Sequence, residues 1–85
     1  MQELEPIIGE RVTVIRGFNG VFAGTLSHEG DSYFLSNAEF QEYVFTRPYW
    51  EHCGNVELRD GDEIVFTRAI VDTQFYTFKN RLLSH

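Results

Sequence analysis

The sequence has few of the residues that would suit it to metal, membrane or general polyanion binding. It contains a single cysteine, Cys53, so no disulfide can form within the chain, and one thiol fits a reducing compartment. Seven lysines and arginines stand against thirteen aspartates and glutamates, which gives a net charge of −6 and argues against a general polyanion binder. Any nucleic-acid site must therefore be local.

The chain also lacks a signal-peptide pattern, and no apolar run approaches the roughly 20 residues that a membrane helix requires. We therefore expect a cytoplasmic protein without membrane contact, folded as a single domain over residues 1–85. Aromatic residues, by contrast, are plentiful at 15%, and eight of them are phenylalanine. This content is ample for a packed core in a short chain, although a chain of this length buries only a modest fraction of its surface.

The pattern of apolar residues predicts one short helix followed by strands. Leu4 and Ile7 lie three apart and Gly9 can end a helix, so we expect a helix over about 3–9. From Arg11 the apolar period changes to two, and turn residues divide the rest of the chain. This pattern predicts an all-β fold, a small, strongly bent antiparallel barrel of five strands at about 11–18, 20–28, 32–45, 56–69 and 71–78.

Two glycines carry specific backbone expectations. Asn19-Gly20 is a strong signal for a two-residue hairpin turn, because both residues adopt positive φ at little cost. Gly24 lies inside an apolar strand pattern, where glycine is typical of a bulge or a sharp bend at which a Cβ would clash with a crossing backbone. We therefore predict a bend at Gly24.

The order of these features resembles the Sm/LSm family, including its bacterial Hfq branch, over roughly residues 4 to 78. The family's first motif has a hydrophobic-x-Gly-x-hydrophobic segment at the bend of the second strand, where this chain has Gly24 and Leu26. Its second motif lies on the fourth strand, as Ile-Arg-Gly in eukaryotic and archaeal members and Tyr-Lys-His-Ala-Ile in bacterial ones. The segment 66–70, Phe-Thr-Arg-Ala-Ile, is similar to the bacterial form.

The resemblance implies a non-catalytic protein without a cofactor, assembled into a homo-oligomeric ring of roughly five to seven subunits. Such a ring would bind single-stranded RNA, or single-stranded DNA, in RNA or DNA processing. Arg68 would lie near the central pore, where ring symmetry concentrates its charge, although it could equally be a solvated arginine at a strand end. Replacing Arg68 by Ala is accordingly expected to abolish oligonucleotide binding and leave the fold intact.

Further candidates for nucleic-acid contact lie upstream of Arg68. Ser32, with Asp31, approximates the position of the family's base pocket. Tyr33 or Phe34 could stack on a base, but on strand alternation at most one of them can face a ligand, and either could be core. Asn37 could contact a base edge or serve as a turn or bulge residue.

The last strand predicts the mode of assembly. It is rich in aromatics and has no central charge or proline, so it forms an exposed edge that can recruit another chain. We expect the edge formed by residues 63–69 of one copy to accept 71–78 of the next, head to tail, which closes into a ring where the rotation permits. The predicted interface residues are Phe66, Val71, Phe75, Tyr76 and Phe78.

The connection over 46–55 follows an aromatic-rich stretch and leaves two interpretations open. Aromatics with an interleaved arginine, Arg47, can bind single strands, or they can pack on a neighbouring subunit. We favour packing, because Glu42 and Glu51 would repel phosphate. The alternative function is an SH3-like protein-interaction module that uses this loop and the acidic surface. No spacing of His and Cys indicates a metal site, 60–63 reads as a turn, and no catalytic motif is present.

Overall fold

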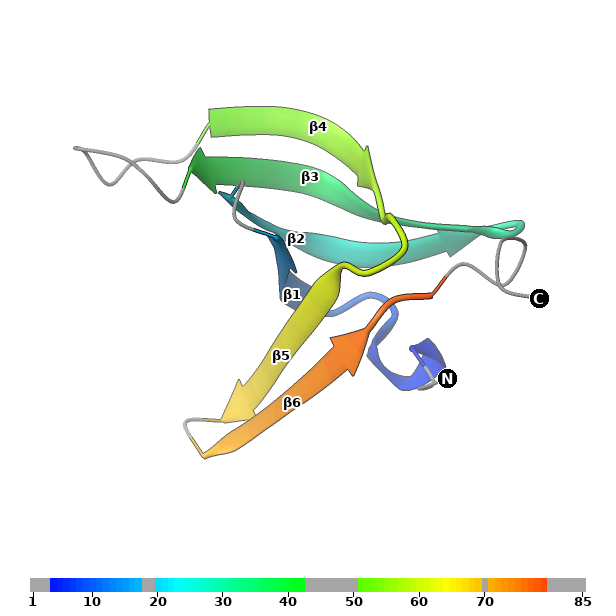
Figure 1. Cartoon of the computed structure of the whole chain (residues 1–85). Helices are drawn as coiled ribbons and strands as arrows, with labels where there is room; N and C mark the ends of the chain where they lie inside the picture. The colour runs from blue at the N-terminus through cyan, green and yellow to red at the C-terminus, as the bar shows by residue number, and fades with distance from the viewer. Residues whose placement is uncertain (1–3, 18–19, 43–50, 70, 80–85) are drawn as a thin grey trace.

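The fold is known from a computed structural model that describes residues 4–17, 20–42, 51–69 and 71–79. These residues form one 3-10 helix, η1 (Glu5–Ile7), and a single antiparallel sheet with the strand order β4-β3-β2-β1-β5-β6 (Figure 1). The prediction of an all-β fold is confirmed. The strands are β1 (Arg11–Arg16), β2 (Gly20–Glu29), β3 (Ser32–Glu42), β4 (Glu51–Glu57), β5 (Glu63–Ala69) and β6 (Asp72–Thr77).

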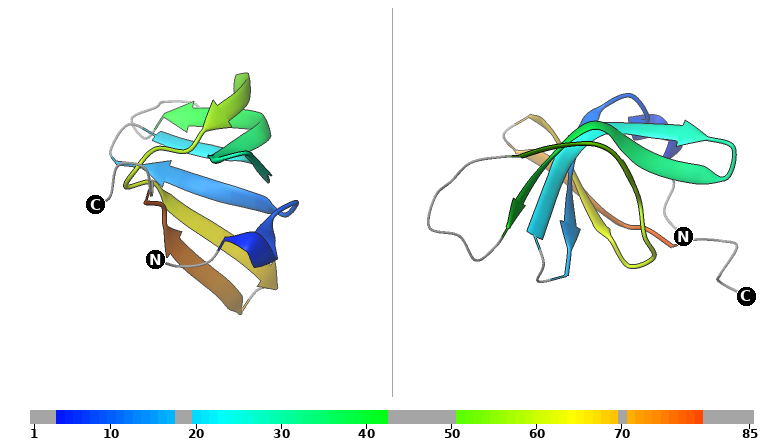
Figure 2. Two further views of the ribbon diagram at one scale, coloured as in Figure 1. Left: turned by 90° about the vertical axis from the view of Figure 1, so that its right-hand side faces the viewer. Right: turned by 90° about the horizontal axis from the view of Figure 1, so that it is seen from above.

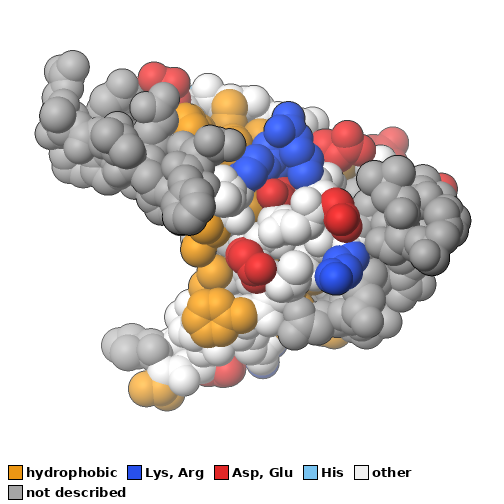
Figure 3. Space-filling view, in the orientation of Figure 1, with side chains coloured by type: hydrophobic (Ala, Val, Ile, Leu, Met, Phe, Trp, Pro, Cys, Tyr) orange, Lys and Arg blue, Asp and Glu red, His pale blue; other side chains and the backbone are white. Residues whose placement is uncertain are grey.

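The sheet is folded into two arms that meet at β1. Strands β2, β3 and β4 form one arm, and the β5–β6 hairpin forms the other (Figures 1 and 2). Between the arms the molecule is hollowed on the side where β5 ends, and hydrophobic side chains lie along the rim of this hollow (Figure 3). At the opposite end lie η1, the β2–β3 hairpin and the C-terminal end of β6 (Figure 1).

The predicted strand over 56–69 is wrong, because the chain turns in its middle. The amide of Asp62 donates to the carbonyl of Arg59 at 3.0 Å, and Gly61 has φ of 95°, as required at the third position of a type II turn. This turn separates β4 from β5, which raises the number of strands in the described residues to six. It also confirms that 60–63 lies at a turn.

The predicted five-stranded barrel is corrected by the same topology. Strands β4 and β6 are the two edges of the sheet, and within the described residues they do not pair with each other. The observed sheet is therefore open. The helix is also shorter than the predicted 3–9: it has three residues, and the amide of Gly9 donates to the carbonyl of Leu26 at 2.7 Å instead of continuing the helix.

The turn between β1 and β2 differs from the predicted two-residue form. Arg16 pairs with Gly20, which leaves three positions, 17–19, between the strands. Gly20 is thus the first residue of β2, and the two-residue Asn19-Gly20 turn is wrong. Residues 18 and 19 themselves lie outside the described residues.

The bend predicted at Gly24 is confirmed. The register between β2 and β3 shifts between the pairs Ala23–Glu39 and Thr25–Ser36, so β3 has an extra residue opposite Gly24. A Cβ at Gly24 would lie 3.0 Å from the carbonyl oxygen of Ser36 and 3.1 Å from the Cα of Ala38. The two backbones therefore approach so closely here that a side chain at this position would force one of them to shift.

The core lies on the inner face of the bent sheet. Strand alternation places Val12 and Val14 of β1 in it, and η1 closes one end with Ile7, which is fully buried. The buried apolar residues of this cluster are Leu4, Ile7, Val12, Val14, Leu26, Leu35, Ala38, Leu58, Ile64, Phe66 and Phe78.

One ion pair is built into this core. Asp62, in the β4–β5 turn, is 2% exposed, and both of its carboxylate oxygens accept hydrogen bonds from Arg16 of β1, at 3.0 and 2.9 Å. The same guanidinium donates to the carbonyl oxygen of Glu57 at 3.0 Å. Arg16 thereby fixes the end of β4 and the following turn to β1.

Candidate nucleic-acid interface

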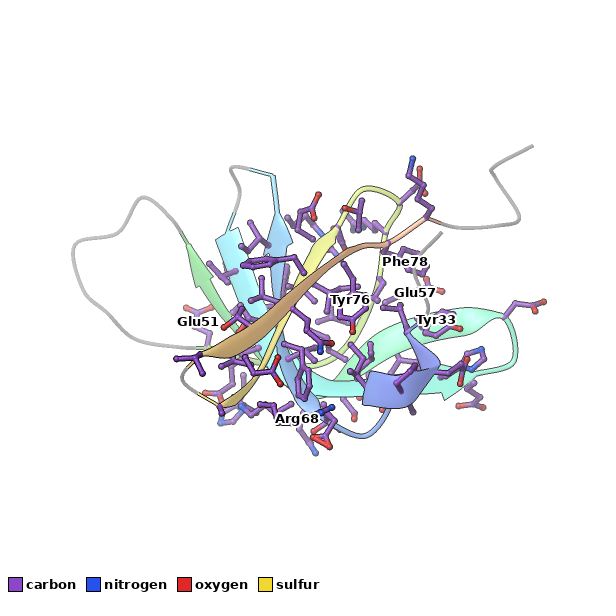
Figure 4. All side chains as sticks on the ribbon, turned by 90° about the horizontal axis from the view of Figure 1, so that it is seen from below. Tyr33, Glu51, Glu57, Arg68, Tyr76 and Phe78 are labelled. Atoms are coloured by element: carbon purple, nitrogen blue, oxygen red, sulfur yellow. The ribbon has the colours of Figure 1, made fainter. Side chains whose placement is uncertain are left out.

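The structure separates the residues predicted to contact nucleic acid. Arg68 is exposed near the end of β5, with its guanidinium carbon 5.5 Å from the centre of the Phe66 ring. Figure 4 places Arg68 well apart from Tyr33, Glu57 and Phe78, which lie close together at the other end of the sheet. Within one copy of the chain, Arg68 and Tyr33 therefore cannot contact the same base.

Tyr33 faces inward and holds η1 against the sheet. Its ring stacks on that of His28 with a centroid distance of 4.1 Å and an interplanar angle of 2°, and it meets the edge of Phe78. Its hydroxyl donates to Glu5 Oε1 at 2.9 Å, and His28 Nδ1 lies 3.4 Å from the same oxygen. These contacts give Tyr33 a structural role in the described residues.

Of the neighbouring residues Tyr33 and Phe34, Phe34 is the one that faces outward. Leu35 on its C-terminal side is fully buried, so Phe34 lies on the opposite face of β3, where it is half-buried and pairs with Glu57 of β4. Ser32 shares the face of Phe34, because the two are two positions apart, and its hydroxyl donates to Glu57 Oε2 at 3.1 Å. Ser32, Phe34 and Glu57 thus form one outward-facing group, called the Phe34 face below.

Asn37 lies at the bulge opposite Gly24, with φ of 52°. Asparagine is among the few residues that tolerate this left-handed conformation, and its backbone role explains its identity without a ligand. The bulge interpretation of Asn37 is therefore the one that the structure supports directly. Its side chain is exposed, so a contact with a base remains sterically open.

Two charged residues were missed by sequence reasoning: Glu57, which belongs to the Phe34 face, and Arg59, which follows it after one residue. Arg59 is exposed and begins the β4–β5 turn. This turn is held next to Tyr33 and Phe78 by the backbone: the amide of Leu58 donates to the carbonyl of Tyr33 at 2.8 Å, and that of Gly61 to the carbonyl of Phe78 at 2.8 Å. No local sequence signal indicated that this turn lies beside the β2–β3 hairpin.

The charges around this end of the sheet are mostly negative. Arg59 and Lys79 are exposed cations here. The exposed carboxylates on the same hairpin, turn and helix and at the end of β4 are those of Glu5, Glu29, Asp31, Glu57 and Asp60. Elsewhere Arg11 is paired with Glu39 at 3.2 Å and Arg16 with Asp62 at 2.9 Å. A phosphate would therefore find few uncompensated cations on the described surface.

The residues predicted for the oligomer interface also divide. Phe66 and Phe78 are 4% and 6% exposed and belong to the core of their own chain. Val71 and Phe75 are 93% and 64% exposed, and Tyr76 is half-buried. An interface could use the last three.

The predicted pairing of 63–69 with 71–78 of a second copy stays a prediction. Within one copy, β5 pairs with β6 along its whole length and with β1 over residues 63–65. The outermost strands of the sheet in the described residues are β4 and β6. The predicted connection 46–55 also ends earlier, since residues 51–55 belong to β4. Residues 43–50 lie outside the described residues.

The only cysteine lies on this exposed edge strand, β4. Cys53 Sγ donates weakly to the carbonyl oxygen of Ala38 at 3.5 Å. Partial burial, and then the carboxylates of Glu39 and Glu51, raise the pKa of the Cys53 thiol above its usual range. The local potential at β4 is thus negative.

Among the described residues, no three His, Cys, Asp or Glu side chains are grouped so that they could hold a metal ion. None of the helical residues described makes a segment long and apolar enough to cross a membrane. No protein-family model, curated protein or solved structure matches this chain.

Proposed function

We propose that this chain is a divergent Sm-like protein that assembles into a homo-oligomeric ring and binds single-stranded RNA or DNA without catalysis. The observation that carries the proposal is the close approach of Gly24 to β3 at the bend of the second strand, where a Cβ would lie only 3.0 Å from the carbonyl oxygen of Ser36 and 3.1 Å from the Cα of Ala38. This is the place at which the Sm-like resemblance requires a glycine.

A second observation is that the segment following β4 resembles the family's second motif better than residues 66–70 do. The fourth strand ends at Glu57, and the sequence Leu58-Arg59-Asp60-Gly61 follows it. Only Asp60 separates Arg59 from Gly61. This segment is similar to the Ile-Arg-Gly of the family's fourth strand, whereas 66–70 lies on the fifth strand. We therefore propose Arg59, in place of Arg68, as the cation nearest the ligand.

In this proposal the Phe34 face binds the base and Arg59 meets the backbone. A base stacked on the Phe34 ring would gain roughly 1 to 3 kcal/mol. One such site beside several carboxylates would be weak. Repetition of the site around a ring raises the overall affinity, because each further contact of the same strand is intramolecular.

Assembly would join the two outermost strands, β4 of one copy and β6 of the next. Neither edge strand contains a proline or a lysine, the residues that commonly protect sheet edges from pairing. The contact joins unlike surfaces, so it is head to tail and forms a ring if its rotation closes.

Two measurements test the proposal together. The mass of the intact assembly, by native mass spectrometry or sedimentation, is expected to be a small integral multiple of 9.9 kDa. A fluorescence titration with short single-stranded RNA and DNA, repeated over a range of salt concentrations, is expected to show saturable binding that weakens with salt. A monomer that binds no oligonucleotide even at low salt would refute it.

The second candidate function is an SH3-like protein-interaction module without nucleic-acid binding. The observation that favours it is electrostatic: Arg11 and Arg16 are each paired with a carboxylate, and carboxylates outnumber cations around the Phe34 face. A monomer that binds basic peptides, and whose affinity for them falls with salt, would support this candidate over the first.

A further inference from the structure

We propose that Glu57 makes the Phe34 face selective for guanine over the other bases, with uracil the most weakly bound. This inference rests on the proposed nucleic-acid function and names the base that the same site takes. The side chain next to the Phe34 ring is the carboxylate of Glu57. A carboxylate repels the phosphate backbone of a nucleic acid, but it can accept hydrogen bonds from a base.

The structure holds this carboxylate in place from two sides. The backbone carbonyl oxygen of Glu57 accepts a hydrogen bond from Arg16 Nη2 at 3.0 Å, so the end of β4 is fixed to β1. Its side-chain Oε2 accepts from Ser32 Oγ at 3.1 Å, which ties the carboxylate to β3. A group oriented in advance loses less conformational entropy when a ligand binds.

The carboxylate also lies beside the ring on which a base would stack. Phe34 and Glu57 are opposite each other in the β3–β4 register, and directly opposed residues have Cβ atoms about 5 Å apart. A base stacked over Phe34 would therefore present its edge toward Glu57. Among the described side chains, Ser32 is the one that donates to this carboxylate, and each oxygen can accept more than one hydrogen bond.

An ionised carboxylate only accepts hydrogen bonds, so it selects among bases by the donors on their edges. Guanine alone has two adjacent donors on its Watson–Crick edge, N1–H and N2–H, which can meet the two carboxylate oxygens together. Adenine and cytosine each have one amino group next to an acceptor. Uracil has one N–H between two carbonyl oxygens, and both of these would face the negative carboxylate. The expected order is therefore guanine first and uracil last.

The test uses five-residue RNAs that differ only at the centre, UUGUU, UUAUU, UUCUU and UUUUU, since a single guanine avoids self-association of G-rich strands. With the full chain, the guanine-containing strand is expected to bind about tenfold tighter than UUUUU, or more, as for a good two-hydrogen-bond contact to a base. The measured quantity is the ratio of the two dissociation constants in fluorescence anisotropy at fixed salt.

Two variants and one control make the result specific. In Glu57→Gln the side chain keeps one acceptor and gains a donor, so it can no longer pair with both donors of guanine. The ratio of the dissociation constants of UUUUU and UUGUU is expected to fall to within about threefold of unity. UUUUU itself should bind more tightly, because the negative charge is lost. Ser32→Ala, which releases the carboxylate, should lower the ratio partway. Glu29→Gln removes an equivalent exposed charge from the end of β2 and should leave the ratio unchanged.

Equal binding of the four RNAs by the wild-type chain would overturn the role of Glu57 and leave the proposed function standing. A guanine preference that survives in Glu57→Gln would overturn it as well. If none of the four RNAs binds at any salt concentration, the proposed nucleic-acid function itself fails, and the inference fails with it.

Discussion

Arg16 and Asp62 meet through two hydrogen bonds, at 3.0 and 2.9 Å, where the side chain of Asp62 is 3% exposed and that of Arg16 14%. The pair joins β1, at the centre of the sheet, to the β4–β5 turn, through which the chain passes from one arm to the other. Removing one partner of such a pair leaves the other charge buried without compensation, which is far more costly than losing the attraction itself.

We expect Asp62→Asn to lower the free energy of unfolding by about 3 kcal/mol, as for other buried pairs that lose one partner. Urea unfolding followed by circular dichroism measures this. Asp31→Asn, in the exposed β2–β3 turn, is the control and should change the free energy by no more than about 0.5 kcal/mol. Similar losses in both variants would show that the ion pair is not what stabilises the chain.

Gly24→Ala is expected to destabilise the chain by about 1 to 3 kcal/mol, the usual range for overpacking. The added Cβ would lie 3.0 Å from the carbonyl oxygen of Ser36, so the backbone of β2 or β3 must move. Thermal unfolding measures the effect, with Thr25→Ala on the same strand as the control. A Gly24→Ala variant as stable as the wild type would mean that the bend is softer than the contacts indicate.

The raised pKa of Cys53 predicts slow alkylation near neutral pH. Only the thiolate reacts, so a thiol with a higher pKa has less thiolate at a given pH. We expect the midpoint of the iodoacetamide rate against pH to lie above that of an unstructured cysteine peptide. Glu51→Gln should lower the midpoint, because it removes one of the carboxylates that oppose ionisation, and Glu10→Gln, on another element, should not.

Arg59 and Arg68 can be distinguished directly by oligonucleotide binding. Arg59→Ala is expected to weaken binding about tenfold, because it removes the cation beside the Phe34 face, and to reduce the dependence on salt. Arg68→Ala is expected to change the affinity less than about threefold unless assembly brings Arg68 of a neighbouring copy to the ligand. The reverse order of effects would restore the motif assignment to residues 66–70.

Phe75→Lys is expected to shift the assembly toward monomer. Phe75 is 64% exposed on β6, and a lysine on an edge strand opposes pairing with a second chain. Sedimentation at micromolar concentration measures the shift, and Glu10→Lys, which also introduces a lysine but away from either edge, is the control. An assembly that is equally stable in the Phe75→Lys variant would exclude β6 as a contact between copies.

The sequence was sufficient for features that depend on neighbouring residues. The alternation of Tyr33, Phe34 and Leu35 correctly separates inner from outer faces, and Gly24 stands out because it interrupts an apolar strand. The residues 60–63 indicate a turn, but the predicted strand bounds 56–69 run through it, since the apolar pattern keeps the same parity from Val56 across the turn to Phe66. Strand alternation alone therefore does not show that the chain leaves one strand and begins another here.

Ser32 and Phe34 were candidates from the sequence, but their juxtaposition with Glu57 and Arg59 had no local signal. Phe34 meets Glu57 because β3 pairs with β4, and the β4–β5 turn lies beside the β2–β3 hairpin because its backbone bonds to Tyr33 and Phe78. Contacts between distant segments depend on the register of the whole sheet, which one-residue slips would change completely. For this reason the sequence alone favours Arg68 over Arg59.

The central position of β1 has a consequence for the way the chain folds. Its first neighbour, β2, follows it directly, whereas its second neighbour, β5, comes after β2, β3 and β4. The arm of consecutive hairpins can form from local contacts, but joining the second arm requires closure of a loop that spans most of the chain. Such non-local pairing is associated with slow folding, on the order of milliseconds to seconds, and it predicts that the Arg16–Asp62 contact forms late.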